Sequence, residues 1–224
     1  MSDSLGPLLV ALRLGSAALP IGAFAYSQAL EQAVADGAVR DAASAERWIV
    51  GLLGASVLTN DVPFFVALHV AWTDGDAARA RKLSEALFAT RPTRELRDEE
   101  RQLGRALFRL TAKLGIETAG CENDDRATLA SAFALHAARG GLDASAGAAS
   151  YCFAWAEAQV SSATRLVPLG QSEAQLVLSA ALRVLERDLS AAIARDLADA
   201  TSTAPRHAIL SAAHETLHSR LFRS

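Results

Sequence analysis

The chain contains 224 residues with a net charge of −3 at pH 7, and 51% of the residues are apolar. This length allows one large domain with a sizeable core, and the charge gives no support to non-specific binding of nucleic acid or anionic membranes. Two cysteines without C-x-x-C spacing and an N-terminus without a basic region predict a cytoplasmic chain with no disulfide framework and no signal peptide.

Apolar residues recur with the helical period along the whole chain, and no stretch of useful length alternates as a strand does. Much of the apolar content is alanine, the strongest helix former, and aromatic residues make up only 6%. We therefore predict an all-α protein: residues 1–224 form a single compact domain of about ten helices with a C-terminal tail helix. The predicted helices cover residues 5–14, 23–35, 45–58, 62–73, 76–89, 93–114, 127–139, 145–166, 171–198 and 208–221.

Short polar residues mark where some of these helices begin. Asp41 and Ser44 are suitable caps for the third predicted helix, and Asp61 for the fourth, which tolerates Pro63 in its first turn. The polar residues before Pro63 also divide the most apolar stretch, 48–72, into two pieces too short to span a bilayer. We expect two buried helices there.

Two segments interrupt the helical pattern. Residues 115–126 form the clearest predicted loop. Small and polar residues at 198–206 indicate a linker before the last helix. We expect this linker and the tail at 207–224 to become ordered when a partner binds.

The sequence HETLH at 214–218 has the H-E-x-x-H pattern of zinc peptidases. On a helix, His214 and His218 would share a face and Glu215 would activate a metal-bound water. The glycine and third histidine of the longer pattern are absent, and His207 is the one nearby substitute. A polar helix face is the simpler interpretation.

The helix predicted at 93–114 carries arginines at positions 97, 101, 105 and 109, an i, i+4 row. Such a row repels itself by a few tenths of a kcal/mol per pair unless carboxylates offset it. The row is either a solvated, salt-bridged face or a docking stripe for an acidic protein surface. Gly104 inside this helix predicts close approach of another helix backbone.

Signals for catalysis are missing. The sequence has no G-x-x-x-x-G-K-(S/T) and no G-x-S-x-G, so we expect no nucleotide hydrolysis by this chain, no catalytic residues and no resident metal or cofactor. His69 and Cys152 lie in apolar helices and are expected to be core residues. The stretches 18–31 and 165–175 combine Pro-Gly breaks with aromatic, hydroxyl and amide side chains, which favours binding over catalysis.

Four stretches, in order, resemble motifs of the urease accessory protein F (UreF) family, and together they span nearly the whole chain. Residues 12–31, LRLGSAALPIGAFAYSQALE, resemble its signature S-x-A-L-P-(V/I)-G-G-F-S-Y-S-x-G-L-E. Residues 93–107, TRELRDEERQLGRAL, resemble R-E-L-R…Q-x-G-R-A-L. Residues 165–175, RLVPLGQSEAQ, resemble R-L-x-P-L-G-Q-(S/T)-x-x-Q, and residues 214–224, HETLHSRLFRS, resemble H-E-T-x-x-S-R-L-F-R-S. On this resemblance, HETLH is an accidental match completed by a histidine at a variable position.

The chain departs from the first motif at Ala23, Ala25 and Ala29, where the family has glycine, serine and glycine. These replacements are expected to stiffen the backbone locally.

The resemblance implies an all-helical cytoplasmic adaptor that is not an enzyme. Such a protein forms a homodimer, binds accessory protein D (H in some bacteria) and recruits the GTPase accessory protein G. The complex docks on apo-urease, and GTP hydrolysis by the G protein drives nickel into the urease active site.

The matched positions then receive hypothetical roles. Phe24 and Tyr26 pack beside the tail, where Arg220 and Arg223 form charge-assisted hydrogen bonds with Glu215 or with partner carboxylates. The arginine row, with Arg165, Gln171 and Gln175, is the candidate site for docking of the G protein. Arg165 and Glu31 also suit buried structural roles. The predicted partner-binding residues are Phe24, Tyr26, Ser27, Glu31, Arg97, Arg101, Arg105, Arg165, Gln171, Gln175, His214, Glu215, Arg220, Phe222 and Arg223.

Two alternatives from other classes remain at this point. One is a zinc-dependent hydrolase that uses the HETLH segment. The other is a helical scaffold for a different partner.

Overall fold

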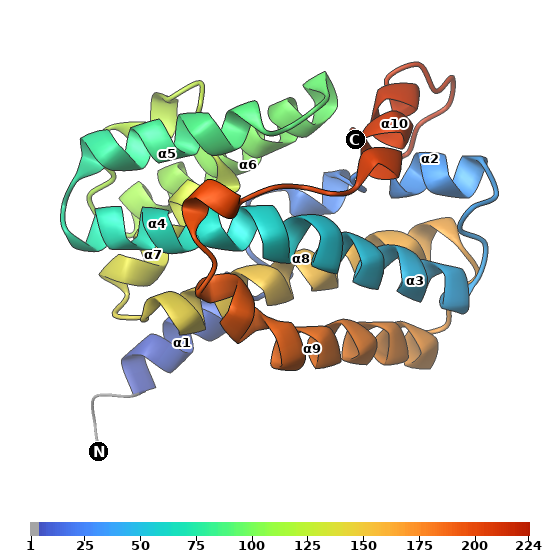
Figure 1. Cartoon of the computed structure of the whole chain (residues 1–224), viewed down its shortest axis with the longest axis horizontal. Coiled ribbons are helices and arrows are strands. Elements are labelled where there is room, and N and C mark those ends of the chain that lie inside the picture. The colour runs from blue at the N-terminus through green and yellow to red at the C-terminus, as the bar shows by residue number, and fades with distance from the viewer. Residues whose placement is uncertain (1–4) are drawn as a thin grey trace.

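The computed structural model describes residues 5–224, and these residues form helices and turns with no strand, which confirms the all-α prediction (Figure 1). The α-helices are α1 (Leu5–Leu14), α2 (Leu30–Ala35), α3 (Ala42–Leu52), α4 (Val62–Thr73), α5 (Ala77–Ala89), α6 (Arg94–Lys113), α7 (Leu129–Arg139), α8 (Ala144–Leu166), α9 (Gln171–Ile193) and α10 (Pro205–His214). Shorter elements are η1 (Ala23–Ala25), the π-helix η2 (Leu53–Asp61), η3 (Cys121–Asn123) and η4 (Leu197–Asp199).

The core lies where α4, α7 and α8 pack against one another. Phe65, Phe133 and Tyr151, one from each helix, form an aromatic cluster with ring centroids 5.5 to 6.2 Å apart. In Figure 1, α5 and α6 lie on one side of this layer and α9 on the other. His69 and Cys152 are buried in this core, and the His69 ring lies 2.9 Å from the carbonyl oxygen of Leu142, as expected for a core histidine.

The prediction of two separate helices at 48–72 is wrong, because α3, η2 and α4 form one continuous rod, Ala42–Thr73. By length and composition this rod could cross a membrane, but 67% of its most apolar window is buried in the fold, as in the core helix of a globular protein. Asp41 caps the rod through a capping box with Ser44, as expected. Asp61 does not act as a cap, because it lies inside the rod with helical dihedral angles.

The π-helix accommodates Pro63 within the rod. A proline has no N–H group for the carbonyl four residues earlier, here that of Thr59. The Thr59 carbonyl instead accepts a hydrogen bond of 3.1 Å from the N–H of Thr201, and the carbonyl of Ala55 accepts one of 2.8 Å from Thr203. Residues 200–204 of the predicted linker therefore form an extended segment along the π-helix, between η4 and α10.

The prediction of a helix at 23–35 is also wrong for the first half of that range. After the single turn η1, Tyr26 is extended, and Gln28 and Ala29 have positive φ angles of 51° and 63°. This left-handed conformation favours glycine, so the family's glycine at the position of Ala29 has a conformational reason. The helix cannot form here because the backbone N–H of Ser27 donates to the carbonyl of Ser224, 3.0 Å away.

The two C-terminal helices are shorter than predicted. α9 ends at Ile193 rather than at residue 198, and α10 covers Pro205–His214 rather than 208–221. After His214 the N–H groups of Thr216 and Leu217 form tight turns with the carbonyls of Ala213 and His214. Further along, the N–H groups of Leu221 and Phe222 donate to a side-chain carboxylate of α2. Residues 215–224, called the tail from here on, are irregular but packed.

Gly104 allows α6 and α7 to approach closely, as predicted. A Cβ atom at Gly104 would lie 2.6 Å from the carbonyl carbon of Thr128 and 2.8 Å from its oxygen, at the N-cap of α7. Backbone atoms cannot move aside as a flexible side chain can. The two helices would have to separate.

We therefore expect Gly104→Ala to lower the free energy of unfolding by about 1–3 kcal/mol, the usual range for overpacking. The matched control is Gly51→Ala, because Gly51 also lies inside a helix but has open space around it. That change should raise stability by roughly 0.5–1 kcal/mol through helix propensity. Urea denaturation measures both, and equal effects of the two changes would contradict the close contact.

Candidate functional site

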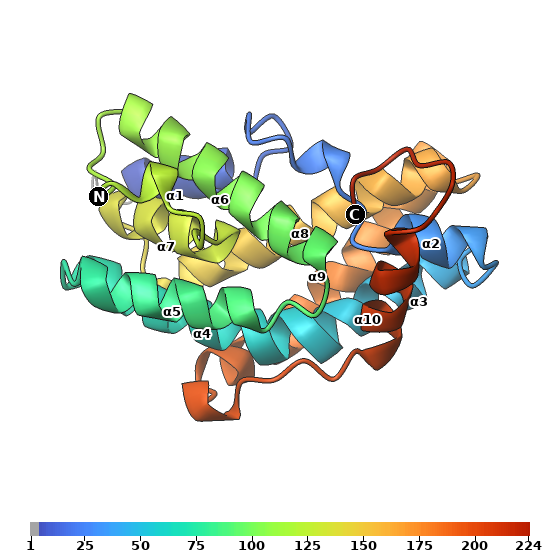
Figure 2. The ribbon, with the colours of Figure 1, turned by 90° about the horizontal axis from the view of Figure 1, so that it is seen from above.

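The tail folds back over α2 and the N-terminal end of α6 and finishes beside η1 (Figure 2). Each of the four motif stretches supplies a side chain to its surroundings. We call the buried side chains that hold it the tail cluster, which consists of Ser27, Glu31, Glu95, Glu99 and His214.

Glu31 is the anchor of the tail cluster on α2. Its carboxylate accepts hydrogen bonds from the backbone N–H groups of Leu221 at 2.7 Å and Phe222 at 3.0 Å. The Nε2 atom of His214 lies 3.1 Å from the same carboxylate. Burial by itself would raise the pKa of Glu31, but these donors hold the pKa below its ordinary value. The ionised Glu31 carboxylate therefore holds the tail in place.

His214 connects two helices through its fully buried ring. Nδ1 lies 2.6 Å from a carboxylate oxygen of Glu95 on α6, while Nε2 faces Glu31 on α2. Arg220 of the tail donates to the other oxygen of Glu95, 2.6 Å away. Ionised carboxylates only accept hydrogen bonds, so both ring nitrogens donate or one carboxyl group carries the proton. Each buried charged group here has a hydrogen-bonding partner, as burial of a charge requires.

The HETLH segment has no geometry of a zinc site. Neither ring nitrogen of His214 is free for a metal, and the Glu215 carboxylate accepts a 3.0 Å hydrogen bond from the N–H of Arg94 at the start of α6. His218 lies past the end of α10 and is exposed. Across residues 5–224, no group of three or more His, Cys, Asp or Glu side chains could hold a metal ion. The zinc hydrolase interpretation is therefore not supported.

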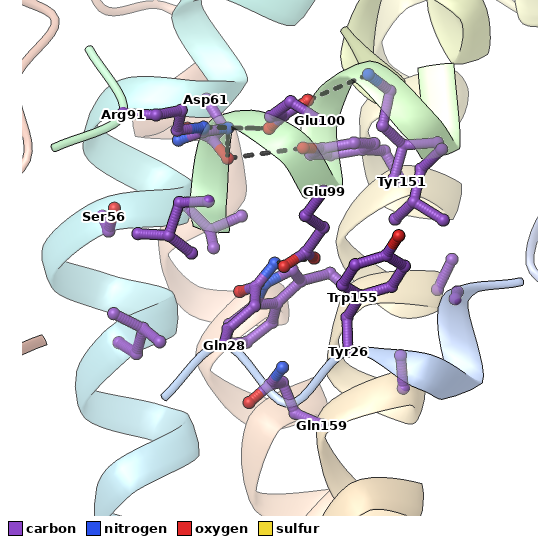
Figure 3. A pocket seen from close by; sticks show the side chains of 18 of the residues that line it. Tyr26, Gln28, Ser56, Asp61, Arg91, Glu99, Glu100, Tyr151, Trp155 and Gln159 are labelled. Atoms are coloured by element: carbon purple, nitrogen blue, oxygen red, sulfur yellow. Dashed lines mark hydrogen bonds and ion pairs between the residues drawn. The ribbon is translucent and has the colours of Figure 1, made fainter. Parts of the chain in front are cut away.

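Glu99 fixes the last residue of the tail. Its carboxylate accepts hydrogen bonds of 2.7 Å from the Ser224 hydroxyl and from the Gln28 amide, and Trp155 in turn donates to Gln28 at 2.8 Å. Figure 3 shows Glu99, Gln28 and Trp155 converging in this way. Burial raises the pKa of Glu99 to about 7.

This pKa predicts a pH-dependent effect of Glu99→Gln. The folded chain binds more protons at Glu99 than the unfolded chain between pH 4.5 and about 7, so its contribution to stability falls as the pH rises through that window. A neutral glutamine removes this loss, which is at most about 3 kcal/mol. We expect urea denaturation to show a more stable variant at pH 8 and no difference at pH 4.

Glu186→Gln, at an exposed position of α9, is the control and should show no such pH dependence. The same stability difference for Glu99→Gln at both pH values would contradict a buried carboxylate that titrates near neutrality.

Tyr26 and Arg223 meet at one side chain of α6. The Tyr26 hydroxyl donates to Oε1 of Gln102 at 2.7 Å, and the Arg223 guanidinium donates to the same oxygen at 3.1 Å. The backbone N–H of Arg223 also donates to the carbonyl of Ala25 at 2.8 Å. The tail and the η1 loop are thus joined directly.

Arg165, at the end of α8, contacts both the tail and the segment that contains η1. Its guanidinium donates to the carbonyl of Phe24 at 3.0 Å and lies 5.2 Å from the ring centroid of Phe222, a cation–π distance. Phe222 is buried, whereas the ring of Phe24 is 71% exposed. The Arg165 side chain therefore makes structural contacts within the chain.

The arginine row on α6 is half-exposed to exposed and partly salt-bridged. Arg101 pairs with Asp98 and Arg105 with Asp125, the second at 3.2 Å. Arg97 lies on the same helix without an ion pair among the described residues. The row is thus a solvated face on which not every charge is compensated.

Gln171 and Gln175 lie apart from the tail. Both are exposed on the first turns of α9, and within residues 5–224 no hydrogen bond joins their side chains to the tail. The structure therefore separates these two from the other predicted site residues.

Next to the tail cluster, an ion cluster lines a cavity of 320 Å³ between α6, α8 and the rod (Figure 3). Arg91 donates to both carboxylate oxygens of Asp61 at 2.8 Å and also to Glu100. Tyr151 donates to Asp61 at 3.3 Å, and Glu100 accepts from the N–H of Leu129 at 2.9 Å. Burial disfavours the charge on Arg91, but the two carboxylates hold its pKa well above the ordinary value.

Several of these residues were not predicted from the sequence. One available signal was the i, i+4 spacing of Glu95 and Glu99, which places two carboxylates on one face of α6. For Gln28, Arg91 and Gln102 the sequence offered no comparable signal, because their partners are distant along the chain.

Comparison with known proteins identifies similar chains over the whole length. A family model described as UreF matches residues 39–182. A urease accessory protein UreF of Bordetella parapertussis is 41% identical over 95% of this chain and 100% of its own length, and one of Alkalilimnicola ehrlichii is 38% identical over 100% of both. The bifunctional urease accessory protein UreEF of Bordetella bronchiseptica is 41% identical over 98% of this chain, which spans 52% of that longer protein.

Proposed function

Because the chain belongs to the UreF family of urease accessory proteins, we propose that it is a non-enzymatic adaptor in the maturation of urease. It acts in the cytoplasm as a homodimer with accessory protein D (or H) and the GTPase accessory protein G. The complex docks on apo-urease, and nickel enters the urease active site as GTP is hydrolysed by the G protein. Nickel is cargo in this process, and the chain itself supplies no P-loop for the nucleotide.

The main support is the way all four motif stretches meet at the tail. A tail held by buried ionic hydrogen bonds from α2 and α6 is a rigid platform, and rigid platforms bind partners with less loss of entropy. α10 and the tail expose apolar side chains beside it, since Ile209 of α10 is 67% exposed and Leu221 of the tail is 58% exposed. Exposed apolar side chains next to polar ones are typical of protein interfaces.

We assign the tail, with Phe24 and Tyr26, to accessory protein D or to the second copy of the chain. The arginine row, with Arg165, Gln171 and Gln175, is assigned to the G protein, for which an acidic surface is expected. Binding of such a partner adds its interface energy to that of the tail cluster and so keeps the tail in this ordered conformation.

A urease activation assay tests this function. Cells that carry a complete urease operon except for this gene should contain urease with little nickel, and expression of this chain should restore both nickel content and activity. Urease that acquires its full nickel content without the chain would contradict the proposal.

A double variant, Ile209→Asp with Leu221→Asp, should fold normally because both side chains are exposed, but should lose activation. The matched control is Leu114→Asp, at an exposed leucine on the far end of α6. Equal activation of urease by the two variants would show that the tail is not the docking element.

A further inference from the structure

A groove about 450 Å³ in volume separates the η1 loop from α6. One wall carries Ile21 and Phe24, and the other carries Arg101, Arg105 and Arg109 on one face of the helix. Arg223 of the tail completes the groove. We call it the arginine groove.

The arginine groove concentrates positive charge in a chain that is acidic as a whole. Four arginines line it, yet the net charge of the chain is −3. Asp98 and Asp125 pair with two of them, while no carboxylate of residues 5–224 forms a salt bridge with Arg109 or Arg223. Neighbouring like charges on a helix repel one another, and an acidic ligand would relieve that repulsion.

The rim of the groove is apolar, and its backbone is held by a hydrogen bond. Phe24 is 71% exposed, an unusual state for so large an aromatic side chain, and it stands next to the half-buried Ile21. The backbone of Phe24 is held, because its carbonyl accepts a 3.0 Å hydrogen bond from Arg165. Rigid exposed aromatic side chains are the usual anchors of protein interfaces.

The spacing of the arginines matches an extended peptide. Residues four apart on a helix rise by about 6 Å. Alternate residues of an extended strand are about 6.6 Å apart. Carboxylates at every second position of such a strand would therefore face successive arginines of α6, and the side chains between them would point the other way.

We propose that the arginine groove binds an extended acidic segment of a partner protein. Its alternate carboxylates bind Arg105 and Arg109, a further carboxylate binds Arg223, and an apolar side chain packs on Phe24. The inference rests on the proposed function, which assigns the arginine row to a partner with an acidic surface, and deepens it by naming the form of the bound segment. Guanidinium groups bind carboxylates with two parallel hydrogen bonds, so the groove selects carboxylates by geometry as well as by charge.

Fluorescence anisotropy with the full-length chain tests the proposal. The probe is a short fluorescein-labelled peptide with glutamate at alternate positions and one leucine, and a matched peptide has glutamine in place of every glutamate. We expect the acidic peptide to bind at low salt and the glutamine peptide not to bind. Replacement of both Arg105 and Arg109 by glutamine should weaken binding about tenfold or more, and Phe24→Ala should weaken it about fivefold.

The control replaces Arg40 and Arg183 by glutamine, two exposed arginines outside the groove. This control has the same net charge as the groove variant and should bind the acidic peptide as the unchanged chain does. Equal weakening in both variants, or binding of the glutamine peptide, would overturn the proposal. A single-stranded thymidine oligonucleotide that binds more tightly than the peptide through the same arginines would overturn it as well.

The outcome is separable from that of the urease activation assay. Peptide binding without urease activation would contradict the accessory function but support the proposal that the groove binds acidic peptides. Activation without peptide binding would contradict the groove alone.

Discussion

Replacement of Arg91 by alanine is expected to lower the free energy of unfolding by about 3–5 kcal/mol, the largest effect of any single change that we predict. The reason is electrostatic: the change leaves Asp61 and Glu100 buried without the cation that both contact. The side chain of Arg91 is only 12% exposed, so its ion pairs are largely removed from bulk water. Urea denaturation followed by circular dichroism gives the value.

The control is Arg187→Ala, since Arg187 forms an exposed pair with Asp188 on α9 and should contribute nothing measurable. A further variant that converts Arg91, Asp61 and Glu100 together to apolar residues should recover part of the loss, because no unpaired charge remains. A loss below about 1 kcal/mol for Arg91→Ala would contradict the buried ion cluster.

The second large effect is expected at Glu31. Glu31→Ala removes the acceptor for the N–H groups of Leu221 and Phe222 and one partner of the His214 ring. Each unsatisfied buried group costs about 1–3 kcal/mol, so the tail should detach locally before the domain unfolds. Amide hydrogen exchange at Leu221 and Phe222 should then accelerate by roughly a hundredfold, which corresponds to about 3 kcal/mol.

Amides in the core, such as that of Phe133, serve as an internal reference and should exchange as slowly as before. Glu31→Gln should have a smaller effect, because one carbonyl acceptor remains. Unchanged exchange at residues 221 and 222 in Glu31→Ala would mean that the tail is held by other contacts.

The prediction of fold class and of most helices followed from the sequence because helical periodicity is a local property. The long helix α6 begins at the predicted place, where Thr93 accepts the N–H of Leu96, and the side-chain volume missing at Gly104 correctly indicated a close helix contact. The cap at Asp41 was predictable for the same reason, since its partner Ser44 lies three residues away.

Predictions failed where the conformation depends on distant residues. Residues 23–29 have the composition of a helix, but Ser27 bonds to Ser224, 197 positions further along the chain. Asp61 looks like a cap in the sequence, but it forms an ion pair with Arg91, which lies in the connection between α5 and α6. No pattern within a short window contains these pairings, so propensity alone could not indicate them.

Part of the candidate site was accessible from the motifs and part was not. The motifs marked Tyr26, Ser27 and Glu31 together with the tail, and the structure places them in contact. They did not identify the carboxylates of α6 that complete the cluster. Acidic side chains in a helix normally suggest a solvated face, and only the three-dimensional packing reveals that Glu95 and Glu99 are buried.

Co-purification with the accessory proteins is the most direct test of the central claim that this chain is the adaptor of a urease maturation complex. The tagged chain is co-expressed with accessory proteins D and G of the same organism, once unchanged and once with Ile209→Asp and Leu221→Asp. We predict that the unchanged chain retains both partners and that the variant, although folded, loses them. An unchanged chain that retains neither partner would contradict the account.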